Sequence, residues 1–230
     1  MDEKKDQTVA VVPVREGSSR IKDKNFVPFG KHATLLENKI QHLKSAKCFN
    51  HIYVSSDSQR VKNIAENCGV EFLYRDPVMC TSKPRWDEVI VAILNTVPGN
   101  PHVVWAMVTS PLFIRYKEAV EVYLSNLNEY DSLVGVKPIR EYLVDDKGRP
   151  LFYSFGIWHP YSNEIKPLFA INDVIFIARK LDQIYWRYWI GRKPSLFHCD
   201  PVESIDINFP EDLELAIVVQ QMVDRRNKGL

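Results

Sequence analysis

The sequence of 230 residues lacks the short motifs that identify several common classes of enzyme. It contains no G-x-G-x-x-G, no G-x-x-x-x-G-K-[ST] and no G-x-S-x-G string, which argues against a Rossmann dinucleotide fingerprint, a P-loop and a serine-hydrolase elbow. The four cysteines lie far apart and form no C-x-x-C pair, so we expect free thiols and no zinc framework. No apolar run approaches the ~20 residues that a membrane span needs.

A strong charge of either sign is also missing. Thirty Lys and Arg residues nearly balance 29 Asp and Glu residues, for a net charge of +1, which argues against nucleic-acid or membrane-surface binding by bulk electrostatics. The polar start MDEKKDQT does not resemble a signal peptide. We therefore expect a cytoplasmic protein without membrane insertion and without a nucleic-acid partner. With 45% hydrophobic residues, the chain can form one domain over residues 1–230.

Short β-branched runs alternate with amphipathic segments along most of the chain. The pattern predicts strands at 8–14, 51–57, 70–75, 102–111, 132–139 and 170–180, a strand end at 203–208, and helices at 35–47, 58–69, 84–97, 117–127 and 210–226. Such alternation predicts an α/β fold: a doubly wound, mostly parallel, Rossmann-like sheet with helices on both faces. Ligands bind such sheets at the carboxyl ends of strands, which here places a site at loops 13–25, 55–57 and 109–111.

Residues 140–168 interrupt this alternation. A DKGRP turn lies between aromatic and β-branched runs, which predicts a hairpin or extended insertion that projects from the sheet. Such an arm could form a dimer contact or a lid, and plain local packing is the alternative.

The loop after the first strand concentrates positive charge beside glycine and hydroxyl groups. Gly17 allows a ligand to approach the backbone closely, and Ser18 and Ser19 offer hydroxyl and N–H groups. Arginine and lysine match phosphate oxygens, and the loop carries Arg15, Arg20 and Lys24. Polyphosphate binding and a merely solvated basic loop are the two interpretations that spacing alone leaves open.

Acidic and amide side chains follow other predicted strands. Asp206 and Asn208 share a face if the chain is extended there, so both could offer oxygen to one hard cation. The alternative is that both cap the last helix, as Asp57 could cap the helix at 58–69. The six histidines show no ligand spacing, and we interpret them as structural.

Six segments, in order from about residue 8 to residue 219, resemble the CMP-sugar-acid synthetases, that is, the acylneuraminate cytidylyltransferases and their CMP-Kdo synthetase-like relatives. They are VVPVREGSSRIKDKN, AKCFNHIYVSSDS, VEFLYRDP, VTSPL, AINDVIFI and ESIDINFPEDLELA. The resemblance implies a nucleotidyltransferase fold with an arm used in dimerisation, and therefore a homodimer. It also implies a reaction in which a sugar-acid hydroxyl attacks the α-phosphorus of CTP, with Mg²⁺ as cofactor, to give a CMP-sugar and pyrophosphate for surface glycan synthesis.

Roles for individual residues follow from the same resemblance. Catalysis would involve Arg15, Lys24 and Asp206. The nucleotide would be held by Arg15, Gly17, Ser18, Arg20, Lys24, Asn25, Arg75, Thr109 and Ser110. Met107 and Asn172 would lie near the sugar acid, and Asp206 and Asn208 would hold the metal.

The sequence departs from the family pattern mainly on the side of the sugar acid. The family's Lys after G-S is Ser19 here, the second Asp of its D-I-D string is Asn208, and the Gln before its P-T-S-P-L turn is Met107. Two family arginines are replaced by Phe113 and Ala170, and the Gly of the family's N-G turn is Asp173. A sugar acid needs a cation for its carboxylate. The lost arginine could be replaced by Arg115, Arg140, Lys137 or Lys166. Two alternatives therefore stay open: a cytidylyltransferase with another acceptor, such as a phosphonate or a phosphorylated small molecule, and a CTP-binding protein without catalysis.

Overall fold

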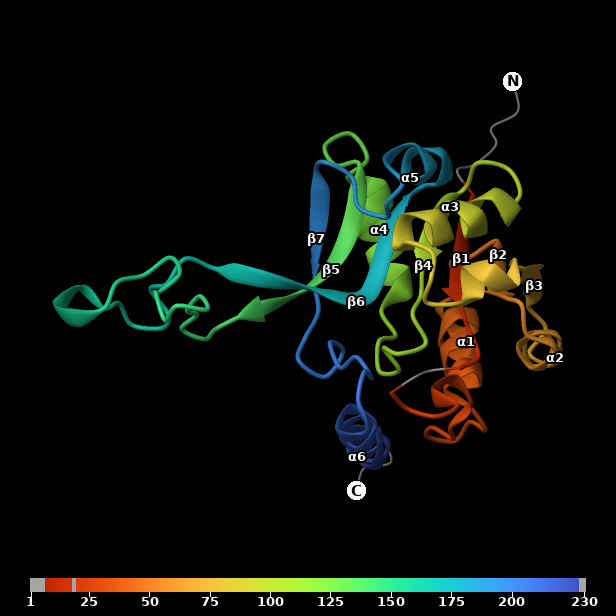
Figure 1. Cartoon of the computed structure of the whole chain (residues 1–230), viewed down its shortest axis with the longest axis horizontal. Helices are drawn as coiled ribbons and strands as arrows, with labels where there is room; N and C mark the ends of the chain where they lie inside the picture. Colours follow the sequence, from red (N-terminus) through yellow and green to blue (C-terminus); the bar gives the residue numbers. More distant parts are fainter. Residues whose placement is uncertain (1–6, 18–19, 228–230) are drawn as a thin grey trace.

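The computed structural model describes residues 7–17 and 20–227 and contains one seven-stranded mixed sheet (Figure 1). The strands are β1 Thr8–Pro13, β2 His51–Ser56, β3 Glu71–Tyr74, β4 His102–Trp105, β5 Ser132–Ile139, β6 Leu168–Arg179 and β7 Pro194–His198. Their order is β3-β2-β1-β4-β6-β5-β7, and only the pairings of β6 with β4 and β5 are antiparallel. The strand order reverses direction at β1, which is where doubly wound sheets form their ligand crevice.

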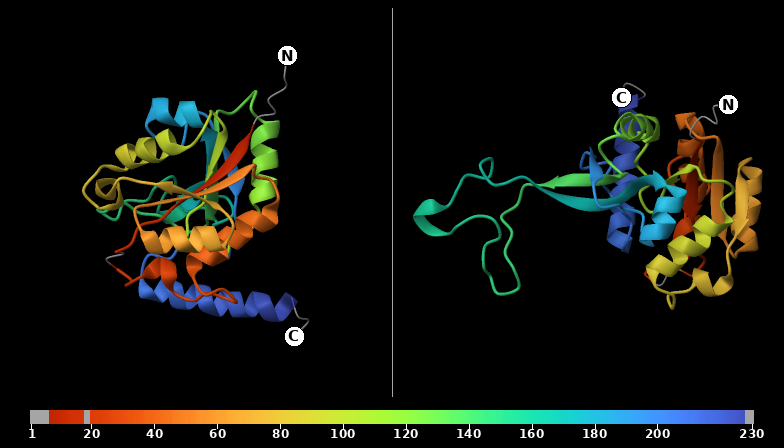
Figure 2. Two further views of the ribbon diagram at one scale, coloured as in Figure 1. Left: turned by 90° about the vertical axis from the view of Figure 1, so that its right-hand side faces the viewer. Right: turned by 90° about the horizontal axis from the view of Figure 1, so that it is seen from above.

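Helices cover both faces of the sheet (Figure 2). They are α1 Leu35–Ala46, α2 Gln59–Asn67, α3 Trp86–Thr96, α4 Tyr116–Ser125, α5 Lys180–Trp186 and α6 Pro210–Asn227, with short 3₁₀ helices η1 Lys24–Phe26, η2 Pro77–Cys80 and η3 Gly156–Trp158. No helix among the described residues is long and apolar enough to cross a bilayer.

The alternation of side chains along β1 explains the two layers of helices. Ala10 and Val12 point into the core formed with α1, α2, α4 and α6, whereas Val9 and Val11 point into the core beneath α3 and α5. A strand that is buried on both faces has a continuous apolar sequence. The sequence TVAVVP has this pattern, so it predicted a strand.

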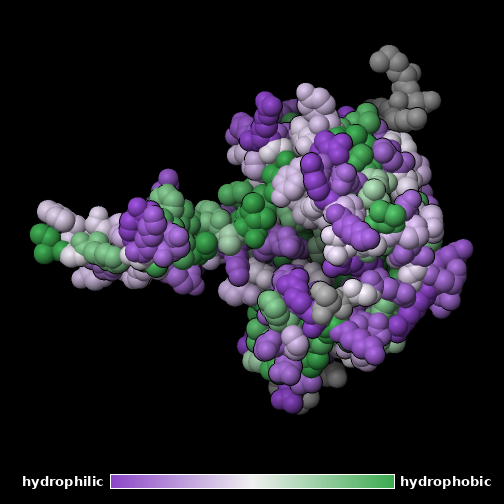
Figure 3. All heavy atoms as spheres, in the orientation of Figure 1, coloured by the Kyte–Doolittle hydropathy of each residue, from purple (hydrophilic) through white to green (hydrophobic). Residues whose placement is uncertain are grey.

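The chain between β5 and β6 projects from the body as an arm, residues 140–167 (Figure 1). Its rings pack on one another, with Tyr142 5.3 Å from Tyr153 and 4.5 Å from His159 between ring centroids. Apolar residues alternate with hydrophilic ones along it (Figure 3). Ile157 and Trp158 are 91% and 79% exposed. The predicted projecting insertion is confirmed, and a role in dimerisation or as a lid stays a prediction.

One expectation about local structure was wrong, and one alternative is excluded. Residues 203–208 form no strand, because the backbone N–H of Ile207 bonds to the Thr109 carbonyl of a turn rather than to a sheet neighbour. Asp57 does not cap α2, since the cap is Ser58, whose hydroxyl accepts from the N–H of Val61. The elements α5 and β7 were not expected. The remaining predicted helices and strands are present, although the strand predicted at 102–111 ends at Trp105. The cysteines are free as expected.

Candidate active site

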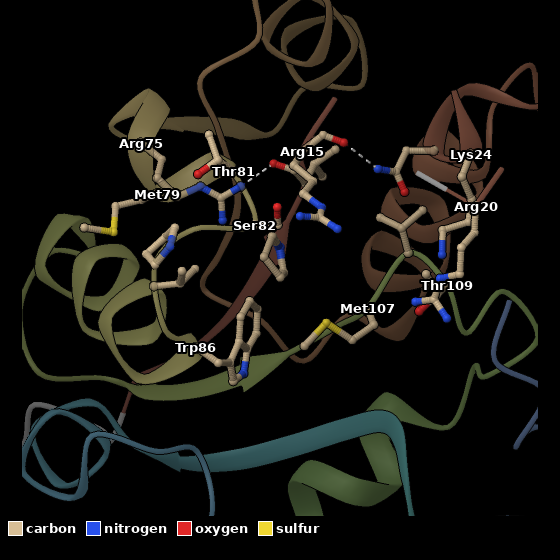
Figure 4. Close-up of a pocket in the computed structure, with 16 residues that line it drawn as sticks. Arg15, Arg20, Lys24, Arg75, Met79, Thr81, Ser82, Trp86, Met107 and Thr109 are labelled. Carbon is tan, nitrogen blue, oxygen red and sulfur yellow. Dashed lines mark hydrogen bonds between the residues drawn. The ribbon is translucent and has the colours of Figure 1, made fainter. Parts of the chain in front are cut away.

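A pocket of about 340 Å³ opens at the carboxyl ends of β1 and β4 (Figure 4). Three parts of the chain line it: the loop after β1, the η2–α3 connection and the turn after β4. The lining residues are Pro13, Val14, Arg15, Arg20, Lys24, Asn25, Arg75, Met79, Thr81, Ser82, Pro84, Trp86, Val89, Met107, Val108 and Thr109. We call it the first pocket. Of the three loops predicted to form the site, 13–25 and 109–111 contribute to this pocket, whereas none of residues 55–57 lines it, and Asp57 lines a different pocket.

The basic residues predicted in the loop after β1 do meet at this pocket. Arg15 and Arg20 are exposed, and the guanidinium of Arg20 lies 5.1 Å from the ring centroid of Phe209. Lys24 is half-buried, and burial lowers its pKa, with Arg20 and Arg15 adding to the effect and Asp206 opposing it. The three cations repel one another, so an anion such as a triphosphate would be stabilised there.

Two other residues of the loop bear on the prediction. Gly17 has φ of +78°, a conformation that favours glycine, and the space beside it is open. Ser18, predicted to contact the nucleotide, lies outside the described residues, as does Ser19.

Arg75 and Asn25 brace the wall of the first pocket. Arg75 is buried; its Nη2 donates to the carbonyl of Val14, and its Nε lies 2.9 Å from Sγ of Cys80. Asn25 Nδ2 donates to the carbonyl of Arg15 at 3.0 Å (Figure 4). Both side chains therefore hold the β1 loop and still line the pocket, where cytosine or ribose was predicted to bind.

The turn at residues 109–111 is a junction that holds several parts of the site together. The carbonyl of Thr109 accepts from Ile207 N at 2.8 Å, and the hydroxyl of Ser110 donates to the carbonyl of Asp173 at 3.0 Å. Thr109 lines the first pocket, whereas Ser110 is fully buried behind it. The predicted contact of Ser110 with the nucleotide therefore has no support from its hydroxyl, which is used within the fold.

Two buried side chains of α1 donate hydrogen bonds to the backbone of the turn at residues 109–111. Lys39 Nζ donates to the Ser110 carbonyl at 2.7 Å and is 2.7 Å from the hydroxyl of Tyr116, while Asn38 Nδ2 donates to the carbonyl of Pro111 at 3.0 Å. Burial lowers the pKa of Lys39 to about 7. Sequence reasoning missed both residues because they look like ordinary polar positions of an amphipathic helix.

A second pocket lies beside the first, between β6 and the start of α6. Its lining residues are Lys137, Ile171, Asn172, Asp173, Pro201, Ser204, Ile205, Asp206, Asn208, Phe209, Asp212 and Leu215. Lys24 joins the two pockets, because its Nζ donates to the carbonyl of Ile207 at 2.6 Å. The predicted metal ligands and the basic loop are therefore neighbours.

Asp206 has the features expected of a metal ligand. Its Oδ2 accepts from Nδ2 of Asn208, while its Oδ1 is buried and has no hydrogen-bond partner among residues 7–17 and 20–227. Over the same residues, no group of three or more His, Cys, Asp or Glu side chains is arranged to hold a metal. A cation at Asp206 would therefore take further ligands from phosphate oxygens and water, as Mg²⁺ commonly does.

The residues expected near the sugar acid occupy different places. Met107 lines the first pocket. Asn172 lines the second, where its Nδ2 donates to the Ser204 hydroxyl at 3.0 Å. Phe113 is fully buried and packs edge-on against Tyr116, with ring centroids 4.9 Å apart, so it belongs to the core and not to a binding surface.

Sequence reasoning also missed the wall of the first pocket that η2, the start of α3 and the connection between them form. Met79, Thr81, Ser82 and Trp86 line it. Trp86 is 42% exposed and lies edge-on to Trp189, with ring centroids 5.2 Å apart. The turn-like string TSKP before a helix was the available signal, because it follows a strand at the same edge of the sheet as the basic loop.

Comparisons with known proteins agree with this geometry. Residues 9–227 match the cytidylyltransferase family. The N-acylneuraminate cytidylyltransferase of Escherichia coli O18:K1:H7 is 29% identical over 231 residues, 96% of this chain and 54% of that protein. The N-acylneuraminate cytidylyltransferase of Streptococcus agalactiae serotype III is 23% identical over 213 residues, 89% of this chain and 51% of that protein. The chain thus spans about half the length of the curated relatives it matches.

A solved structure shows the same fold. That structure, of a CMP:2-keto-3-deoxy-manno-octonic acid synthetase complexed with CTP, superposes with a TM-score of 0.68 at 13% identity, covering 94% of this chain and 99% of the other. At this identity the likeness concerns the fold alone. Taken with the extent of the family match, these findings show that the chain belongs to the cytidylyltransferase family.

Proposed function

We propose that this chain transfers CMP from CTP to a hydroxyl of a sugar acid, of the nonulosonic or a related class, and releases pyrophosphate. The product would be an activated CMP-sugar for surface glycan synthesis. The observation that carries the proposal is the convergence of Arg15, Arg20 and Lys24 beside Asp206 at the crevice of a cytidylyltransferase fold. The relatives named above are N-acylneuraminate cytidylyltransferases, which supports a sugar acid as acceptor.

The first pocket would bind the nucleotide. The charges of Arg15, Arg20 and Lys24 would neutralise the triphosphate, and they would stabilise the negative charge that develops on the leaving pyrophosphate. Arg75 and Asn25, fixed by their bonds to the β1 loop, would orient the base or the ribose. Such preorganisation lowers the barrier because the reacting groups need little rearrangement.

We further propose that Mg²⁺ is the cofactor and that Asp206 and Asn208 hold it. The buried Oδ1 of Asp206, which has no hydrogen-bond partner among the described residues, supports this assignment. The ion would supply Lewis-acid chemistry at phosphate oxygens and at the attacking hydroxyl.

The second pocket would bind the acceptor. Of the four cations considered as substitutes for the lost arginines, only Lys137 lines it. Arg115 is held at 2.7 Å by Glu203, and Arg140 and Lys166 lie on the arm. We therefore assign the acceptor carboxylate to Lys137. A different acceptor with an anionic group, such as a phosphonate, is the second candidate, because Met107 replaces the family's amide at the first pocket.

We also propose that two copies associate through the arm, and that the protein acts in the cytoplasm. The exposed apolar side chains of Ile157 and Trp158 at 91% and 79% support the first point. Free thiols at all four cysteines agree with the second.

Pyrophosphate release tests the proposal. The purified chain would be assayed with each nucleoside triphosphate and Mg²⁺ against a panel of sugar acids, including Kdo, sialic, legionaminic and pseudaminic acids. We expect turnover with CTP and one acceptor, and a loss of about 10²- to 10³-fold in kcat for Arg15→Ala. Equal turnover with all four triphosphates, or full activity of Arg15→Ala, would contradict the proposal.

A further inference from the structure

Asp173 lies on β6 at an irregularity of the sheet. Val134 of β5 pairs with Phe176, but Val136 pairs with Ile171, so Gly135 alone lies opposite residues 172–175. A side chain on Gly135 would clash with Asn172, whose Oδ1 would be 2.6 Å from its Cβ. Bulges of this kind re-aim side chains and are common beside active sites. Here the bulge brings Asp173 to the rim of the second pocket.

Hydrogen bonds fix the backbone of Asp173 and that of Asp206 to the same turn. The carbonyl of Asp173 accepts from the Ser110 hydroxyl at 3.0 Å, and Ile207 N, next to Asp206, donates to the Thr109 carbonyl at 2.8 Å. A third bond, from Asn172 Nδ2 to the hydroxyl of Ser204 at 3.0 Å, joins the two segments directly. The two carboxylates therefore come from segments whose relative position is fixed.

Acidic side chains outnumber basic ones among the described residues that line the second pocket, with Asp173, Asp206 and Asp212 against Lys137. Asp173 and Asp206 therefore lie at the same hollow, where two carboxylates can share one cation. Asn208 contributes no charge, and it donates its amide N–H to Asp206. Lys24 lies near Asp206 and offsets part of its charge, and its ammonium also donates to the carbonyl of Ile207. The Oδ1 of Asp206 has no partner within residues 7–17 and 20–227 and can take an external cation.

We propose that Asp173 supplies the second carboxylate of the divalent-cation site built on Asp206, a role that the neutral Asn208 does not fill. This inference rests on the proposed function, because the cation would be the one that accompanies the triphosphate. Hard divalent cations bind more tightly as the number of charged oxygen ligands increases. The two carboxylates would thus hold an ion between the first and second pockets.

Binding of Mn²⁺, measured without turnover, tests the inference. Water-proton relaxation distinguishes Mn²⁺ held by protein from Mn²⁺ on free CTP, and titrations would be run on the full chain with and without CTP. Asp173→Asn should weaken Mn²⁺ binding by about 10- to 100-fold, and Asp206→Asn should do so at least as strongly. The matched control is Glu211→Gln, which removes a charge from an exposed position in the first turn of α6 and should leave the affinity unchanged.

A reciprocal exchange strengthens the test. Adding Asn208→Asp to Asp173→Asn should restore Mn²⁺ binding, because it returns the lost charge two residues from Asp206. If Asp173→Asn fails to fold, Asp173→Glu, which keeps the charge but displaces it by one methylene, takes its place, and weaker Mn²⁺ binding is again expected.

The outcomes separate the inference from the proposed function. If Asp206→Asn loses Mn²⁺ while Asp173→Asn binds it as tightly as the unaltered chain, Asp173 is only a solvated carboxylate and the inference is wrong. If the unaltered chain holds no Mn²⁺ in the presence of CTP, the metal-dependent reaction itself fails, and the inference fails with it.

Discussion

Replacing Lys39 by methionine should remove a pH dependence of stability that its buried amine creates. Lys39 is fully buried on α1, and burial lowers the pKa of its amine to about 7 from an ordinary value near 10.5. In the unfolded chain the amine keeps its ordinary pKa. Between these two values the unfolded state therefore binds more protons than the folded state, and the free energy of unfolding rises with pH.

The size of the effect follows from the two pKa values. One unit of difference corresponds to about 1.4 kcal/mol, so the free energy of unfolding should rise by about 2 kcal/mol between about pH 7.5 and about pH 9. The chain loses this part of its free energy of unfolding as the pH falls from about 10.5 towards 7, because burying the charged amine becomes costly. Buried thiols act in the opposite direction, since burial raises the pKa of Cys48 and of Cys199 to about 11. Comparison with Lys39→Met cancels these thiol contributions.

Urea unfolding at several pH values across this range measures the effect. The difference in unfolding free energy between the unaltered chain and Lys39→Met should change with a slope approaching about 1.4 kcal/mol per pH unit. The offset between the two proteins combines opposing terms, because the substitution removes a costly buried amine but also deprives the Ser110 carbonyl of its donor. Parallel pH profiles for the two proteins would mean that the amine of Lys39 keeps its ordinary pKa in the folded chain.

Other predictions concern activity and assembly. Asp206→Ala should lower kcat by at least about 10²-fold without changing the midpoint of urea unfolding in metal-free buffer, and an unchanged kcat would contradict the metal assignment. Lys137→Met should raise the KM for the acceptor by about 10-fold and leave the KM for CTP unchanged. Lys166→Met, on the arm, is the control and should alter neither KM. Steady-state kinetics with each substrate varied in turn measures both values. The double change Ile157→Asp and Trp158→Ser should convert a dimer to a monomer, as measured by light scattering after gel filtration. If the unaltered chain is already a monomer at micromolar concentration, the proposed dimer is wrong.

Most of the fold was predictable from the sequence because its elements are strongly patterned. Strands such as TVAVVP are buried on both faces and form continuous apolar runs, and α1 carries its apolar residues at helical spacing. By contrast, β7 has the weakly patterned sequence PSLFH and lies at the edge of the sheet. Residues 203–208 alternate like a strand, yet Ile207 is buried by tertiary packing and bonded to a turn.

The candidate site was predictable only in part, for a physical reason. The basic loop is local, so its composition alone predicted an anion site. The positions of Lys39 and Asp173 depend on contacts with Ser110, which is 71 and 63 residues away in the chain. No local pattern records such a contact. Phe113 illustrates the opposite case, because its departure from the family pattern suggested an altered pocket, whereas the side chain packs in the core.

The transfer of labelled CMP would show whether the chain is a sugar-acid cytidylyltransferase. CTP labelled at its α-phosphorus would be incubated with the chain, Mg²⁺ and each sugar acid in turn, and the products separated and weighed by mass spectrometry. We expect the label to move into one new compound with the mass of a CMP–sugar acid conjugate, together with unlabelled pyrophosphate. Labelled UTP should give no such product. If CTP binds but its label stays in CTP with every acceptor, or if UTP serves equally well, the assignment as a CTP-dependent sugar-acid cytidylyltransferase is contradicted.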